Sequence, residues 1–137
     1  MIYTPEHCEM ILRGEKTQTR RLALPDDMVD YFEWGSIFAV YRGGRMLCGV
    51  GRTSAVQPGR GKKSLGRTLL RAIRHERLQD ISEEDLLAEG GYNDYLSYMA
   101  VWDSINKRKE HQWNANPFVW VREFELAPWL ETPRENG

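Results

Sequence analysis

The sequence predicts an α+β domain in which short strands form a small, partly open β-barrel with helices packed at its ends. Two observations lead to this prediction. Short apolar or alternating segments recur between turns rich in glycine and proline, and two segments with helix-capping residues are inserted among them. The 137 residues fit one domain, expected over residues 1–127, with residues 128–137 as a flexible tail.

The first element is expected to be a helix that begins after Thr4. Threonine caps helix starts, and Pro5 and Glu6 both suit a first turn. Gly14 is a natural stop for this helix. Residues 17–22 then follow a strand-like pattern.

A hairpin is expected next. Residues 36–41 and 45–51 read as strands on either side of Gly43 and Gly44, which are typical hairpin-turn residues. Residues 57–66 contain three glycines and a proline, so they should form a loop. The pattern that follows, over residues 68–78, fits a helix and a strand about equally well.

Two helices and a last strand complete the chain. Ser82 starts a sequence close to a capping box, and Gly90 and Gly91 should end that short helix. Asn93 or Asp94 can cap a second helix, whose buried face is predicted to hold Tyr95, Met99, Trp102 and Ile105. Residues 117–126 alternate as a strand does. On one face of this strand every residue is apolar except a single arginine. The residues of that face are Phe118, Trp120, Arg122, Phe124 and Leu126.

The net charge of −1 conceals an asymmetry along the chain. Residues 1–77 hold 14 of the 19 Lys and Arg residues and 8 of the 20 acidic residues, a net charge of +6, whereas residues 78–137 carry −7. We therefore expect a positive face that attracts a phosphate-bearing ligand. The alternative is that the two halves meet across the fold and neutralise each other.

The composition also argues against several classes of protein. Cys8 and Cys48 have no metal-site spacing and are too few for a disulfide framework, so we expect a reduced cytoplasmic protein without metal or cofactor. No apolar run approaches the roughly 20 residues of a membrane span. Glu6, His7 and Glu9 interrupt the N-terminal segment, which is therefore unlike a signal peptide.

The segment from Gly14 to Arg21 carries the strongest functional signal. Arginine and lysine bind phosphate, and a threonine hydroxyl can hydrogen-bond or act as a nucleophile. On a strand, Thr19 and Arg21 would share a face, and Lys16 could join them only from the turn that Gly14 permits. A solvated strand with ordinary surface charges is the alternative. The candidate binding or catalytic residues here are Gly14, Lys16, Thr17, Thr19, Arg20 and Arg21.

Glu89 is the next candidate, because it ends a predicted helix where its charge meets the negative end of the helix dipole. Residues that break a local rule are sometimes kept for function, although Glu89 could simply point into water. Tyr92, in the glycine-rich segment that follows, is the aromatic residue most expected to contact a ligand. Trp102 and Trp120 fit core positions better.

A basic loop contains Arg60, Lys62 and Lys63 among glycines whose backbone amides can approach a phosphate closely. The loop lacks the order of a Walker motif, and no Rossmann fingerprint is present. It predicts either a clamp for a polyanion, with an affinity that falls as salt rises, or a solvated loop.

These features together resemble the ASCH family. The segment Gly14 to Arg21 has that family's G-x-K-x-x-T-x-R spacing, and the resemblance extends over roughly residues 1–127 through the segments 57–61, 74–90, 102–106 and 113–121. It looks like the phage and bacterial branch of the family. The resemblance implies a PUA-like fold, a strand over residues 68–78, and a cleft lined by the signature that suits a base or nucleotide.

One branch of the family hydrolyses the amide of N4-acetylcytidine with a lysine, a threonine and a glutamate. Lys16 and Thr19 match the first two, and Glu89 is the aligned glutamate, although the loop around it differs. The Thr19 hydroxyl would attack the acyl carbon or orient a water. Lys16 would be the base, with a pKa lowered by burial and by Arg20 or Arg21. Glu89 would relay a proton or bind the cytosine amino edge, and Arg21 would stabilise the oxyanion.

Other ASCH proteins are RNA binders or ribonucleases, so the resemblance leaves two main functions open. The first is an amidohydrolase acting on N4-acylated cytidine. The second is a non-catalytic RNA-binding module, or a ribonuclease, that uses the basic loop and the cleft. Both take a modified nucleoside or RNA as ligand and need no metal or membrane. A protein-binding surface on the second helix is a weaker third interpretation.

Overall fold

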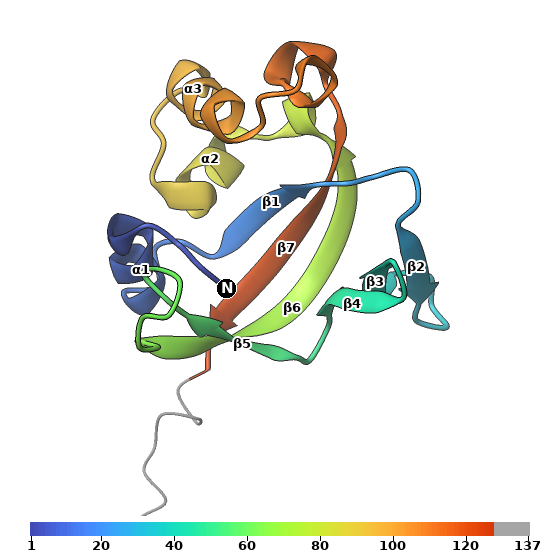
Figure 1. Cartoon of the computed structure of the whole chain (residues 1–137), viewed down its shortest axis with the longest axis horizontal. Helices are drawn as coiled ribbons and strands as arrows, with labels where there is room; N and C mark the ends of the chain where they lie inside the picture. The colour runs from blue at the N-terminus through green and yellow to red at the C-terminus, as the bar shows by residue number, and fades with distance from the viewer. Residues whose placement is uncertain (128–137) are drawn as a thin grey trace, which may run out of the picture.

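The computed structural model describes residues 1–127, and the expected tail over residues 128–137 lies outside the described residues. Its centre is a curled antiparallel sheet with the strand order β1-β7-β6-β5 (Figure 1). A smaller antiparallel sheet, β2-β3-β4, lies beside it, with β3 and β4 in contact with β6. The predicted α+β half-barrel is confirmed. The strands are β1 (Gln18–Leu22), β2 (Met28–Tyr31), β3 (Ile37–Arg42), β4 (Arg45–Gly49), β5 (Thr53–Val56), β6 (Gly66–Arg77) and β7 (Phe118–Leu126).

Three helices pack around the curled sheet. In Figure 1, α2 and α3 lie together at one end of it, and α1 lies at its side. Helix α2 packs against both β1 and α3. The helices are α1 (Pro5–Leu12), α2 (Glu83–Gly90) and α3 (Tyr95–Ile105), and short 3₁₀ turns are η1 (Leu78–Asp80), η2 (Lys109–His111) and η3 (Trp113–Ala115). Among residues 1–127, no helix combines the length and apolar character that crossing a membrane requires.

The helix boundaries follow local capping chemistry, as predicted. The Thr4 side chain accepts a hydrogen bond from the His7 N–H, and Ser82 and Asp85 form a reciprocal capping box. Gly14 and Gly91 have φ values of +77° and +73°, in the left-handed region where glycine is favoured at helix ends. These caps place the end of α1 and the end of α2 beside the start of β1.

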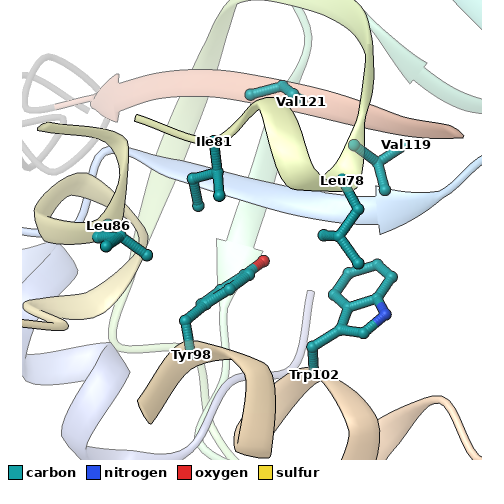
Figure 2. Packing of buried hydrophobic residues seen from close by; sticks show 7 residues of the cluster. All are labelled: Leu78, Ile81, Leu86, Tyr98, Trp102, Val119 and Val121. Atoms are coloured by element: carbon teal, nitrogen blue, oxygen red, sulfur yellow. The ribbon is translucent and has the colours of Figure 1, made fainter. Parts of the chain in front are cut away.

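The buried face of α3 differs from the prediction. Tyr98 and Trp102, one turn apart, face the core, whereas Ile105 is 72% exposed. Figure 2 shows both aromatic side chains projecting from α3 toward the sheet and toward Leu78. The sequence spacing was ambiguous because α3 carries apolar residues on more than one side, and only its contact with α2 and the sheet selects the face.

Strand β7 lies at the centre of the domain, because hydrophobic clusters pack against both of its faces. Val119 and Val121 pack into the cluster under α2 and α3 (Figure 2), while Trp120 and Phe124 belong to clusters on the opposite face. The alternation predicted for residues 117–126 is therefore confirmed. Residues 68–78 also resolve as a strand, because β6 pairs with β5 on one side and β7 on the other. Strands β2 and β5 were not anticipated.

Candidate functional site

The start of β1 docks on the C-terminal end of α2. The Thr17 N–H donates to the Ala88 carbonyl (2.9 Å), and the Lys16 ammonium donates to the Glu89 carbonyl and to the Gln18 carbonyl (2.7 Å). The last carbonyls of a helix lack partners within the helix and form its negative end, so a cation is well placed there. This contact joins Lys16 to Glu89, which lie 73 positions apart in the chain.

A cavity of about 370 Å³ lies at this junction and is called here the main cavity because most of the predicted site residues line it; a cavity of about 470 Å³ beside His75 and Trp120 is larger. Leu22, Val101 and Ile105 form part of its apolar wall. The structure places most of the sequence-predicted site residues together on it, namely Lys16, Thr19, Arg20, Arg21, Glu89 and Tyr92. Helix α3 contributes another wall, and Ile2, Tyr3, Thr4 and His7 line the cavity from the N-terminal segment and α1.

Other predicted residues do not line the main cavity. Gly14 and Thr17 are exposed; Gly14 ends α1, and Thr17 uses its backbone to join α2 and β7. Arg60, Lys62 and Lys63 are exposed on the loop between β5 and β6 and line none of the cavities found among residues 1–127. Any ligand contact of this loop would have to be made outside the cavity.

Glu89 is held by a buried network centred on Arg20. The Arg20 Nη1 lies 3.0 Å from Glu89 Oε2, and Nη2 lies 3.1 Å from both Glu76 Oε1 and Asp85 Oδ2. The other Glu89 oxygen accepts from the Arg20 N–H and the Tyr98 hydroxyl, each at 3.4 Å. Arg20 is therefore committed to three carboxylates, which favours a role in positioning Glu89 over direct contact with a ligand.

Burial sets the protonation of the two charged groups at the junction. Lys16 is 4% exposed, and burial lowers its pKa to about 8, with Arg21 and Arg20 acting in the same direction and Glu89 against it. Burial raises the pKa of the Glu89 carboxyl, against the opposing effect of Lys16 and Arg20. A neutral Lys16 amine can donate its two N–H groups to the two carbonyls it contacts and keep its lone pair free.

Thr19 presents a hydroxyl without a partner. Its side chain is 1% exposed, lines the main cavity, and its Oγ1 has no hydrogen-bond partner among residues 1–127. The Thr19 hydroxyl is close enough to Tyr3 to lower the pKa of the Tyr3 hydroxyl. The two hydroxyls do not, however, meet the geometry of a hydrogen bond. Buried polar groups are nearly always paired, so this oxygen is available to a ligand or a water.

Two more aromatic side chains complete the wall: Tyr98, which the sequence did not single out, and Trp102, which was expected in the core. Tyr98 packs edge-on to Tyr92, with ring centroids 5.3 Å apart, and Trp102 lines the cavity as well as the core. His7 lies 3.5 Å from the Tyr92 hydroxyl, and burial lowers the pKa of its imidazole. The i, i+4 spacing of Tyr98 and Trp102 was a signal for this face of α3. Among residues 1–127, no group of three or more His, Cys, Asp or Glu side chains is arranged to hold a metal.

Comparisons with known proteins place this site in a known fold. No family model matches the sequence, and no curated protein matches it significantly. An ASCH domain from Lactobacillus crispatus JV V101 superposes with a TM-score of 0.62 and 18% identity, covering 87% of this chain and 69% of that chain. The chain has the fold of an ASCH domain.

A second solved structure supports the ASCH fold. Protein EF3133 from Enterococcus faecalis V583, described as DUF984, superposes with a TM-score of 0.60 and 16% identity, covering 88% of this chain and 69% of that chain. The predicted PUA-like architecture is therefore confirmed at the level of the fold. The phage and bacterial branch indicated by the sequence stays a prediction.

Proposed function

We propose that this ASCH-fold protein binds a modified pyrimidine nucleoside, free or within RNA, in the main cavity and hydrolyses the amide of an N4-acylated cytidine there. One observation carries the proposal: Lys16, Thr19 and Glu89 line the same cavity. They supply a base with a pKa of about 8, a hydroxyl that has no hydrogen-bond partner among residues 1–127, and a buried carboxylate. Such a set suits acyl transfer.

The shape and lining of the main cavity suit a nucleobase. Its volume of about 370 Å³ lies in the range of small-molecule sites. Tyr92, Tyr98 and Trp102 offer aromatic surface to a planar ring, while the polar groups gather where α2 meets β1. A cytosine that packs on the aromatic wall would direct its N4 substituent to that polar end.

The proposed reaction uses the three polar residues in turn. Neutral Lys16 accepts the Thr19 proton as the Thr19 oxygen adds to the acyl carbon, and the ammonium so formed stabilises the resulting oxyanion. The carbon–N4 bond then breaks, and Lys16 returns the proton to the departing amino group. Water hydrolyses the acyl-threonine ester and restores the enzyme. In the alternative route, Thr19 orients a water that attacks directly.

Glu89 has a different part in this proposal. Its carboxylate, fixed by Arg20, accepts a hydrogen bond from the cytosine N4 edge and so orients the amide toward Thr19. The same contact stabilises the amino group as it leaves. Glu89→Gln should therefore raise KM and lower kcat together, because the amide can donate as well as accept and no longer specifies one orientation.

The decisive experiment incubates the purified protein with N4-acetylcytidine and follows the release of cytidine and acetate. We expect release by the wild type and its loss in Lys16→Ala and Thr19→Ala. Lys62→Ala is a matched control, because it also removes a cation but from the exposed loop. Circular dichroism and thermal unfolding would verify that the site variants fold. Release that persists in Lys16→Ala or Thr19→Ala would contradict the mechanism, and no release by wild type would contradict the reaction.

A second candidate function, a non-catalytic RNA-binding module, is favoured by the basic loop. Arg60, Lys62 and Lys63 are exposed, and none of them forms an ion pair within residues 1–127. Unpaired loop cations can follow a phosphate backbone. This function predicts RNA binding that weakens steeply with salt, without any product from an acylated cytidine.

A further inference from the structure

We infer that the ligand of the main cavity carries a phosphate group, which Arg21 and Arg122 bind in an adjoining side cavity. The inference rests on the proposed function in that the base occupies the main cavity. The side cavity measures about 230 Å³ and is lined by Arg21, Arg42, Arg122, Trp120 and Asn106, among others. It would make the ligand a nucleotide or a nucleotide unit of RNA, not a free nucleoside.

The pairing of β1 with β7 brings the two arginines together. Thr19 lies opposite Arg122, and Arg21 lies opposite Trp120. Thr19 and Arg21 share a face of β1 because they are two residues apart, so Arg21 and Arg122 are diagonal neighbours on one face of the sheet. Diagonal neighbours stand about 7–8 Å apart, within reach of one anion for two long side chains.

Neither arginine has a counter-ion among residues 1–127. The Arg122 side chain forms no hydrogen bond or ion pair there, and its Nε is buried without a partner. Burial lowers the pKa of Arg122, and the nearby charge of Arg21 adds to the effect. Within the described residues, Arg21 donates only to the Arg20 carbonyl (3.2 Å) and the Met1 sulfur (3.3 Å). Partly buried cations that lack a counter-ion are unfavourable, so this arrangement calls for an anion.

The same fold surrounds its fully buried arginine with acids and leaves only the Nε of that side chain without a partner among residues 1–127. Arg20, the residue between Thr19 and Arg21, contacts three carboxylates. Asp27, which contacts two residues of the side cavity, is already engaged by Arg42 at 2.7 and 2.8 Å and by the Trp120 indole N–H at 2.8 Å. The described part of the chain therefore provides acids for Arg20 and Arg42 and none for Arg21 and Arg122.

The two cavities share a wall, which allows one ligand to occupy both. Arg21, Leu22 and Asn106 line the main cavity and the side cavity alike. A nucleotide whose base lies against the aromatic wall could place its phosphate between Arg21 and Arg122. Guanidinium groups bind phosphate oxygens through paired, charge-assisted hydrogen bonds. Lys16 lines the main cavity but not the side cavity, so it would remain free for the amide.

The first test uses inorganic phosphate and does not depend on any reaction. Phosphate should raise the thermal midpoint of the wild type and of Arg71→Gln, a matched variant that removes an exposed arginine. It should not raise the midpoint of Arg122→Gln or of Arg21→Gln, the second variant in case the first folds poorly. An equal phosphate shift in all four proteins, or no shift in the wild type, would overturn the inference.

The second test compares cytidine with its 5′-monophosphate, its 3′-monophosphate and a cytidine-containing dinucleotide by calorimetry. At least one phosphorylated form should bind the wild type roughly tenfold more tightly than cytidine, and Arg122→Gln should lose that difference. The preferred form distinguishes a free nucleotide from a unit of RNA. Equal affinity for all four ligands would overturn the inference. Phosphate preference without amide hydrolysis would contradict only the proposed reaction, and hydrolysis without phosphate preference only the subsite.

Discussion

Arg20 and Glu89 form an ion pair, Nη1 to Oε2 at 3.0 Å, in which the arginine side chain is completely enclosed. The pair joins β1 to the last turn of α2 and fixes the Glu89 carboxylate at the main cavity. A glutamate at a helix C-terminus is unfavourable on local grounds. Here the Lys16 ammonium and the Arg20 guanidinium provide the compensating charge.

Breaking this pair from its two sides should have unequal effects. Arg20→Met leaves Glu89 buried without its cation and should lower the free energy of unfolding by about 3–5 kcal/mol. Glu89→Gln should cost less, because Arg20 keeps Glu76 and Asp85. Urea denaturation followed by tryptophan fluorescence measures both. A larger loss in Glu89→Gln than in Arg20→Met would contradict this account of the network.

Thr19→Val should separate stability from activity. The valine removes a hydroxyl that has no hydrogen-bond partner within residues 1–127, so the thermal midpoint should stay the same or rise. Amide release should be lost. Thr19→Ser, which keeps a hydroxyl, should retain release at a reduced rate. A fully active Thr19→Val protein would exclude Thr19 as nucleophile and as the group that orients water.

The rate of amide release should rise with pH through about pH 8. Lys16 must be neutral to accept a proton, and its pKa of about 8 leaves it mostly charged at pH 7. The measurement is kcat/KM against pH from 6 to 9.5 with N4-acetylcytidine. A profile that is flat across this range, or that falls as pH rises, would rule out Lys16 as the base.

The lowered pKa of Lys16 should also appear in the stability of the fold. Between about pH 8 and 10.5 the unfolded chain holds a proton on Lys16 that the folded protein has lost, so unfolding becomes less favourable as pH rises. The free energy of unfolding of the wild type relative to Lys16→Met should increase by about 3 kcal/mol over this window. Urea titrations of both proteins at several pH values test it. A constant difference would mean that Lys16 titrates normally.

The basic loop should govern RNA affinity through charge alone. Replacing Arg60, Lys62 and Lys63 by glutamine should flatten the plot of log affinity for single-stranded RNA against log salt by about 2. The control replaces three exposed cations elsewhere, Lys107, Arg108 and Lys109, and should leave that slope unchanged. Equal slopes for wild type and the loop variant would show that RNA does not contact the loop.

Local features of this chain could be predicted from neighbouring residues. Thr4 and Ser82 begin helices where their side chains cap the backbone, and Gly14 and Gly91 end them where φ is positive. The alternation over residues 117–126 gave β7. The spacing of Lys16 and Thr19 indicated a polar site. Each of these signals acts over a few residues, and chain geometry at that range depends little on the rest of the molecule.

Burial and long-range pairing could not be predicted in the same way. The alternation on β7 showed that Arg122 interrupts an otherwise apolar face. The role of Arg122 depends on the pairing of β7 with β1, which places Arg21 on the same face. Residues 68–78 became a strand because β5 and β7 pair with them from both sides. The buried face of α3 was decided by its packing on α2 and the sheet.

By itself the sequence determined the helix caps, the hairpin turn, the alternation of β7 and the polar segment that opens β1. Only the tertiary structure brought Glu89 onto Lys16, enclosed Arg20 among carboxylates and left Arg21 and Arg122 without one. The physical reason is that caps and turns arise from contacts between residues close in the chain. The pKa of Lys16 and the cavity around it arise from the exclusion of water, which requires every layer of the fold to be in place.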